Sequence, residues 1–138
     1  MISILEVQDI VCRLAKKINA PVLDILTFEI SRDDGTPCVQ VNQKMFYYSA
    51  RDRNVTTYQN QTEDVNELLY WIFRYITNVM AETYAVKHPI NRNFSRRVKF
   101  SKQIHLLKQI DEDWAKKREN EIQELLVLHP YNENENFE

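Results

Sequence analysis

The chain has 138 residues, a length typical of one domain, and its formal net charge is -2 at pH 7. So small a charge gives the whole chain no attraction to nucleic acid or to anionic membranes. Gly35 is the single glycine. This count excludes Gly-rich phosphate loops, dinucleotide fingerprints and G-x-S-x-G nucleophile turns, since each needs several glycines at fixed spacing.

The N-terminal segment and the two cysteines indicate a reduced, cytoplasmic protein without a metal. Glu6 and Asp9 interrupt the first apolar residues and no basic segment precedes them, so we expect no signal peptide. No stretch reaches the roughly 18 apolar residues that span a membrane. Cys12 and Cys38 lack C-x-x-C spacing and have no histidine cluster beside them. We therefore predict free thiols in or near the core and no zinc site.

The first predicted element is an amphipathic helix. Ser3 and Glu6 have the spacing of a capping box, in which each side chain accepts a backbone N–H of the other at the start of a helix. Apolar residues behind it recur at helical spacing and predict a helix over 4–18. Asn19 and Pro21 are expected to end it.

An antiparallel meander of three or four strands follows. Alternating or β-branched and aromatic residues favour strands, and the predicted strands cover 26–30, 39–41, 45–50 and 55–59. The turn over 32–37 contains Asp34-Gly35, which supplies the positive φ of a hairpin. A second hairpin loop is expected over 51–54.

The second half of the chain predicts two long helices. A broad apolar stripe behind Thr62 predicts a helix over 63–86, which His88-Pro89 ends. A further helix over 94–127 would be about 51 Å long. Because this exceeds a small core, we expect it either to bend near 116–120 or to project its last turns.

These elements give an α+β fold with an N-terminal helix, an antiparallel meander and two long C-terminal helices packed on one sheet face. We predict a single domain over 1–131 and an acidic flexible tail over 132–138. The predicted core consists of apolar residues on the two long helices: Leu69, Ile72, Phe73, Ile76, Phe100, Ile104 and Leu107.

Charge is unevenly distributed along the C-terminal half. Residues 92–118 hold nine basic and three acidic groups, whereas residues 119–138 hold six acidic groups and no basic one. Solvated helix faces explain this pattern, and so does an electrostatic surface for a charged partner. Basic and aromatic residues alternate over 92–100, as in nucleic-acid-binding segments. Phe94 and Phe100, however, fall on the core side of the pattern, which favours packing.

Catalytic signals are lacking in the sequence. His88, His105 and His129 lie in different local contexts, and no two have the spacing of metal ligands. No nucleophile has a recognisable base and orienting group beside it. We therefore expect no enzyme activity and no cofactor.

Segments between residues 45 and 131 follow one family pattern. They are Tyr47-Tyr48, Asp52-Arg53-Asn54, the run from Asp64 to Phe73, Asn91-Arg92, Phe94, Arg96-Arg97, Phe100, Gln103 and His129-Pro130-Tyr131. Together they resemble the Immunity protein 63 family of bacterial polymorphic-toxin immunity proteins. Where this family is expected to have Glu-Arg-Gly, the chain has Asp52-Arg53-Asn54, and the turn is kept because Asn tolerates positive φ.

The resemblance implies a cytoplasmic protein that binds a cognate toxin domain, blocks it in the producing cell and has no catalysis of its own. Many such toxins are nucleases, whose active sites are basic, so we place the toxin-binding surface on carboxylates. The predicted residues are Asp111, Glu112, Asp113, Glu119, Glu121 and Glu124, continued by Glu133, Glu135 and Glu138.

The sequence leaves two alternatives. The first places the interface on the strand residues Tyr47 and Tyr58 with the loop residues Arg51 and Arg53, because Tyr and Arg are enriched where partners bind. The second makes the chain a small nucleic-acid-associated regulator that uses the basic segment 92–118. A membrane partner is not expected, and a monomer is favoured.

Overall fold

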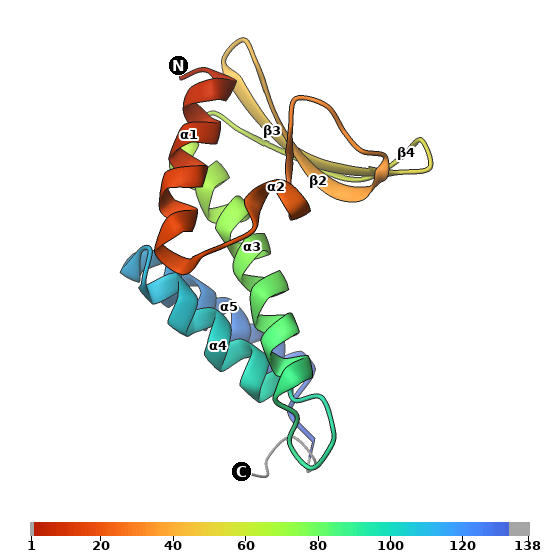
Figure 1. Ribbon diagram of the computed structural model, residues 1–138, viewed down its shortest axis with the longest axis vertical. Coiled ribbons are helices and arrows are strands. Elements are labelled where there is room, and N and C mark those ends of the chain that lie inside the picture. Colours follow the sequence, from red (N-terminus) through yellow and green to blue (C-terminus); the bar gives the residue numbers. More distant parts are fainter. Residues whose placement is uncertain (1, 133–138) are drawn as a thin grey trace. The chain divides into compact units, whose positions relative to one another are not determined.

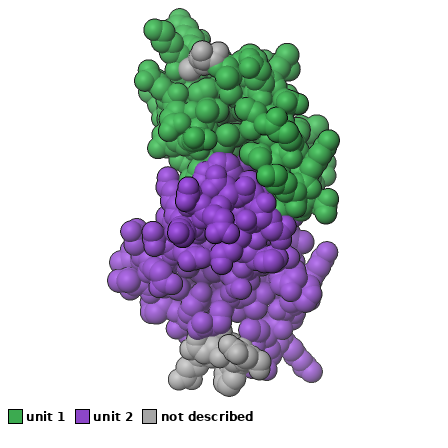
Figure 2. Space-filling view, turned by 90° about the vertical axis from the view of Figure 1, so that its left-hand side faces the viewer, with its two compact units in different colours: residues 1–72 green, residues 73–138 purple. Residues whose placement is uncertain are grey.

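The computed structural model describes residues 2–132, and the predicted tail residues 133–138 lie outside this range. The chain divides into two compact units, residues 1–72 and residues 73–138 (Figure 2). The division falls within one long helix, and the single domain expected over 1–131 stays a prediction.

Unit 1 opens with the predicted helix. Helix α1 (Ile4–Ala15) continues into a single 3-10 turn, η1 (Lys16–Ile18). The capping box is confirmed, since Ser3 Oγ accepts the Glu6 N–H at 3.2 Å and Glu6 Oε1 accepts the Ser3 N–H at 3.1 Å. Asn19 ends the helix in the left-handed conformation at φ 54°. A short helix, α2 (Val22–Ile25), then follows Pro21 and was not predicted.

A four-stranded sheet follows in unit 1 (Figure 1). Its strands, in sheet order, are β1 (Thr27–Phe28), β2 (Asp34–Asn42), β3 (Met45–Asp52) and β4 (Val55–Thr62). Strands β2, β3 and β4 pair antiparallel, as predicted. The α+β class is therefore confirmed.

The prediction of a hairpin at 32–37 is wrong, because β1 runs parallel to β2, with Thr27 beside Cys38. The sheet is consequently mixed. The alternating pattern over 26–30 does not continue as a strand, since Glu29 turns the chain with a φ of 73° and Ile30 is 78 % exposed. Gly35, with a φ of 89°, lies inside β2 and not at a hairpin turn.

The turn between β3 and β4 agrees with the sequence. Arg53 and Asn54 both have positive φ, at 53° and 66°, which is the conformation of a two-residue type I′ turn. The carboxylate of Asp33 accepts the Asn54 N–H at 2.9 Å, and the Asp33 carbonyl accepts the Arg53 N–H at 3.3 Å. The loop before β2 therefore holds this turn in place.

Helix α3 (Val65–Lys87) begins in unit 1 and continues into unit 2. Thr62 Oγ1 accepts the Asp64 N–H at 3.0 Å, and Asp64 Oδ1 accepts the Asn66 N–H at 2.9 Å, so polar side chains satisfy its first turn. The predicted core residues are buried, apart from the half-buried Ile104: Leu69, Ile72, Phe73, Ile76, Phe100 and Leu107.

The last predicted helix is two helices, α4 (Arg96–Lys108) and α5 (Glu112–Leu128). The bend expected near 116–120 is wrong, because the chain breaks at 109–111 instead. Asp111 Oδ1 accepts the Asp113 N–H at 2.8 Å and the Trp114 N–H at 3.2 Å, which starts a new helix. The break lets α4 and α5 pack against each other in unit 2 (Figure 1). None of the helices in the range 2–132 is long and apolar enough to cross a membrane.

Candidate functional site

The acidic residues predicted on the last helix serve different purposes in the structure. Asp111 is the N-cap of α5, so its carboxylate is committed to the backbone of the first turn. The carboxylate of Glu121 is bound by two arginines and is half-buried. The carboxylates that α5 leaves exposed are Glu112, Asp113, Glu119 and Glu124. The predicted tail carboxylates Glu133, Glu135 and Glu138 lie outside the described residues.

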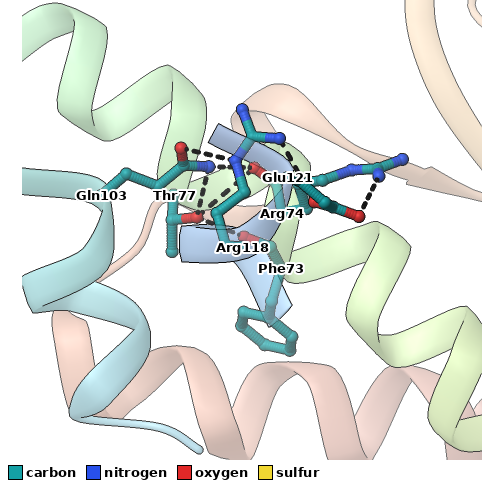
Figure 3. A network of polar contacts seen from close by, with 6 residues as sticks. All are labelled: Phe73, Arg74, Thr77, Gln103, Arg118 and Glu121. Carbon is teal, nitrogen blue, oxygen red and sulfur yellow. Dashed lines mark hydrogen bonds and ion pairs between the residues drawn. The ribbon is translucent and has the colours of Figure 1, made fainter. Parts of the chain in front are cut away.

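Glu121 belongs to a polar network that joins three helices (Figure 3). Its two carboxylate oxygens lie 3.3 Å from Arg74 of α3 and 3.3 Å from Arg118 of α5. Arg118 Nε donates to Gln103 Oε1 at 3.0 Å, and Gln103 Nε2 donates to the Arg74 carbonyl at 3.0 Å and to Thr77 Oγ1 at 3.2 Å. Because Gln103 and Thr77 are fully buried, this network stabilises the packing of unit 2.

The four exposed carboxylates of α5 do not form one cluster. Lysines follow Glu112 and Asp113 by four residues, at the spacing at which opposite charges attract on a helix. Glu119 lies at a groove of about 520 Å³ between α4 and α5, together with the cations Arg97 and Lys108. The acidic charge is therefore spread along the helix and partly offset by neighbouring cations.

Two arginines of the basic segment 92–118 contact residues 129–131, near the C-terminal end of the chain. The Arg97 guanidinium lies 4.2 Å from the centre of the Tyr131 ring, and Arg96 donates to the carbonyls of His129 and Pro130 at 2.9 and 2.7 Å. Phe100 is buried, so its ring is not available to stack on a base. Phe94, expected in the core, is 42 % exposed, because it precedes α4 and lies outside its apolar face.

The alternative residues on the sheet do not share one face. Tyr47 lies opposite Gln61, whereas Tyr58 lies opposite Ala50 on the other face, where its ring is 5.8 Å from that of the buried Tyr48. Arg51 contacts Asp33 at 4.0 Å, and Arg53 is the exposed first residue of the β3–β4 turn.

The face that carries Tyr47 is mostly polar along the three long strands. Its exposed and half-buried residues are Gln40 and Asn42 on β2, Met45, Tyr47 and Ser49 on β3, and Gln59 and Gln61 on β4, and the buried Cys38 lies opposite Ser49. A groove of about 490 Å³ opens here, lined by Glu29, Gln40, Val41, Asn42, Tyr47 and Gln59. Among residues 2–132, Glu29 is the one charged residue of this lining.

Glu29 occupies an unusual turn. The Ile30 N–H donates to the Phe28 carbonyl at 2.9 Å, so Glu29 is the central residue of a γ-turn with a φ of 73°. This type of γ-turn is rare and strained, and a non-glycine residue there costs on the order of 1–3 kcal/mol. The Glu29 N–H donates to Val39 at 2.8 Å, and its carbonyl accepts the Gln40 side chain at 2.9 Å. Nothing in the sequence signals this turn.

The thiols offer no metal site. Cys12 and Cys38 are free, and burial raises the pKa of the Cys38 thiol. Among residues 2–132, no three His, Cys, Asp or Glu side chains lie close enough together to hold a metal ion.

Comparison with known proteins gives one finding. The family model described as Immunity protein 63 matches residues 42–124, a span from the end of β2 into α5 that includes all of β3, β4, α3 and α4. Searches of the curated proteins and of the solved structures gave no match. Since the matched residues make up more than half of the 138-residue chain, the chain belongs to the Immunity protein 63 family.

Proposed function

We propose that this protein binds a cognate secreted toxin domain and neutralises it in the cytoplasm of the cell that produces both. The single observation that carries the proposal is the family match over residues 42–124. In this role the chain acts by occupying a surface of the toxin and has no catalysis of its own.

A nuclease is the proposed class of toxin. A nuclease must hold phosphates, so its active site is basic, and an inhibitor with exposed carboxylates gains association rate from electrostatic attraction. The four exposed carboxylates of α5 support this role: Glu112, Asp113, Glu119 and Glu124. Asp111 and Glu121 are left out because the fold itself uses them.

Co-expression tests the function itself. The probe is the C-terminal domain of the secreted protein encoded immediately beside this chain's gene, produced with and without the chain in the same cells. We expect the domain alone to stop growth, the chain to restore it, and the two purified proteins to form a complex. Failure to bind and protect, with binding of the chain to RNA or DNA instead, would contradict the proposal and favour the nucleic-acid regulator.

Charge variants test the role of α5. Neutralising Glu112, Asp113, Glu119 and Glu124 to their amides should slow association with the toxin domain and weaken its dependence on salt. The matched control neutralises four exposed carboxylates elsewhere: Asp9, Glu63, Glu67 and Glu82. Equal association rates for the two quadruple variants would remove α5 from the interface. Leaving Glu121 unchanged keeps the network of unit 2 intact in both proteins.

A further inference from the structure

The groove on the exposed face of the sheet has the chemistry of a cation site. Its lining includes the acidic residue Glu29 and the aromatic residue Tyr47, and no Lys or Arg among residues 2–132 lines it. Carboxylates bind guanidinium groups through paired hydrogen bonds, and an aromatic ring attracts a cation over its face. The lining therefore favours a positively charged group.

The amide side chains in the groove carry acceptors for a hydrogen-bond donor. Gln40 Nε2 donates to the Glu29 carbonyl at 2.9 Å, which leaves Gln40 Oε1 as its acceptor. The side chains of Asn42 and Gln59, which also line the groove, carry further carbonyl oxygens. An arginine presents five N–H donors in a plane, more than a lysine, and suits several acceptors around one carboxylate.

The position of Glu29 is fixed by its backbone before any partner arrives. Its N–H and carbonyl are both hydrogen-bonded to β2, and the γ-turn around it is closed by the Ile30 N–H. A strained residue that is held this firmly is typical of a functional position, since the strain persists only where the surroundings enforce it. The backbone of Glu29 is therefore fixed beside the groove.

We propose that this groove receives an arginine side chain of the toxin, paired with the Glu29 carboxylate and stacked on the Tyr47 ring. The inference rests on the proposed function, because it names the group of the toxin that the sheet recognises. It adds a short-range anchor to the attraction supplied by α5.

The groove can be tested without the toxin. The probes are N-acetyl-arginine amide, its neutral isostere N-acetyl-citrulline amide, and N-acetyl-lysine amide, each titrated while the ¹H–¹⁵N NMR spectrum of the protein is recorded. We expect saturable shifts at Glu29, Gln40, Tyr47 and Gln59 with the arginine compound, smaller ones with lysine, and loss of the arginine shifts in Glu29→Gln. Equal shifts with arginine and citrulline, or shifts elsewhere only, would overturn the inference.

With the toxin domain, Glu29→Gln should weaken binding by about tenfold or more, mainly through faster dissociation. The matched control is Glu63→Gln, an exposed carboxylate of the same unit outside the groove, which should bind as the wild type does. If the wild type protects against the toxin and Glu29→Gln binds equally well, the inference fails while the proposed function stands. If the wild type does not bind the toxin domain, the proposed function fails. The titration with the arginine compound still tests whether the groove binds an arginine side chain.

Glu29→Gly separates recognition from folding. Glycine adopts positive φ without strain, so this variant should keep or raise the melting temperature while it loses affinity for the arginine probe. If Glu29 had a purely structural role, the affinity for the arginine probe would change in the same direction as the melting temperature. A Glu29→Gly protein that is more stable and binds the arginine probe as well as the wild type does would overturn the inference.

Discussion

Gln103 shows how a polar side chain in a core can be structural. It is fully buried, and its amide contacts the Arg74 carbonyl, Thr77 and Arg118 (Figure 3). Removing the amide would take one hydrogen bond from each of these groups, and a lost hydrogen bond in a buried network is costly. Glu121 depends on the same arrangement through Arg118.

Gln103→Leu should therefore destabilise the protein even though leucine fits the volume and is apolar. The expected loss is about 1–3 kcal/mol for each buried group left without a partner, measured as a lower urea midpoint. Gln123→Leu, an exposed position on α5, is the control and should shift the midpoint little. Equal shifts for the two variants would show that the network does not contribute to stability.

Cys38 links one side chain to the pH dependence of stability. Burial raises the pKa of its thiol in the folded protein. In the unfolded chain the thiol has its ordinary pKa of about 8.5. Above that pH the unfolded chain releases a proton that the folded protein keeps. Stability contributed by the neutral thiol is therefore complete below the unfolded pKa and is lost as the pH rises towards the raised folded value.

The expected result is that the urea midpoint falls between about pH 7 and about pH 9.5, and that Cys38→Ala reduces this fall. Cys12→Ala is the comparison variant, because the Cys12 thiol is only partly buried. The urea midpoint of this variant should change with pH much as that of the wild type does. A Cys38→Ala protein with the full wild-type dependence would assign the effect to other groups.

At the scale of elements, the break between α4 and α5 decides the architecture of unit 2. A continuous helix would carry the residues of α5 away from α4, whereas the connection over 109–111 lets the two helices pack together. Phe73 of α3 and Trp114 of α5 then stack with ring centres 5.7 Å apart. The Asp111 cap is the local device that starts α5 at this point.

Asp111→Ala should lower the melting temperature by the equivalent of about 1 kcal/mol, because the N–H groups of Asp113 and Trp114 lose their acceptor. Asp113→Ala removes a carboxylate from the same turn without removing a cap, so its shift should be smaller. The measurement is thermal unfolding followed by circular dichroism. A shift for Asp113→Ala as large as that for Asp111→Ala would indicate a charge effect only.

At the scale of the whole molecule, the proposals predict that residues of the two units affect different rate constants of toxin binding. In the first proposal, the exposed carboxylates of α5 in unit 2 would attract a basic toxin over a distance and raise the association rate. In the second, Glu29 in unit 1 would pair with one cation of the bound toxin and slow dissociation. Neither effect requires the two surfaces to be adjacent.

Surface plasmon resonance at two salt concentrations can separate these contributions. The α5 quadruple variant should change chiefly the association rate and its salt dependence, Glu29→Gln chiefly the dissociation rate, and the combined variant should show both changes added. If the effects of the α5 quadruple variant and of Glu29→Gln did not add in the combined variant, the two surfaces would not act independently.

Local patterns in the sequence determined much of the fold. The capping box at Ser3, the stripe of α3 and the turn at Arg53-Asn54 were predictable because capping, helical period and positive φ each depend on residues close together in the chain. The family resemblance was also accessible, and its match over 42–124 supports it. The surface that binds the partner stays a prediction.

Only the tertiary structure decided the orientation of β1, the break before α5 and the roles of the charged residues. The pattern over 26–30 is compatible with a strand in either direction, and in the structure it pairs parallel with β2 and ends in the γ-turn at Glu29. The carboxylates of Glu121 and Glu124 are equivalent in the sequence, yet Arg74, 47 residues away, contacts the first and not the second. Contacts between distant residues determine such differences, and local pattern carries no information about them.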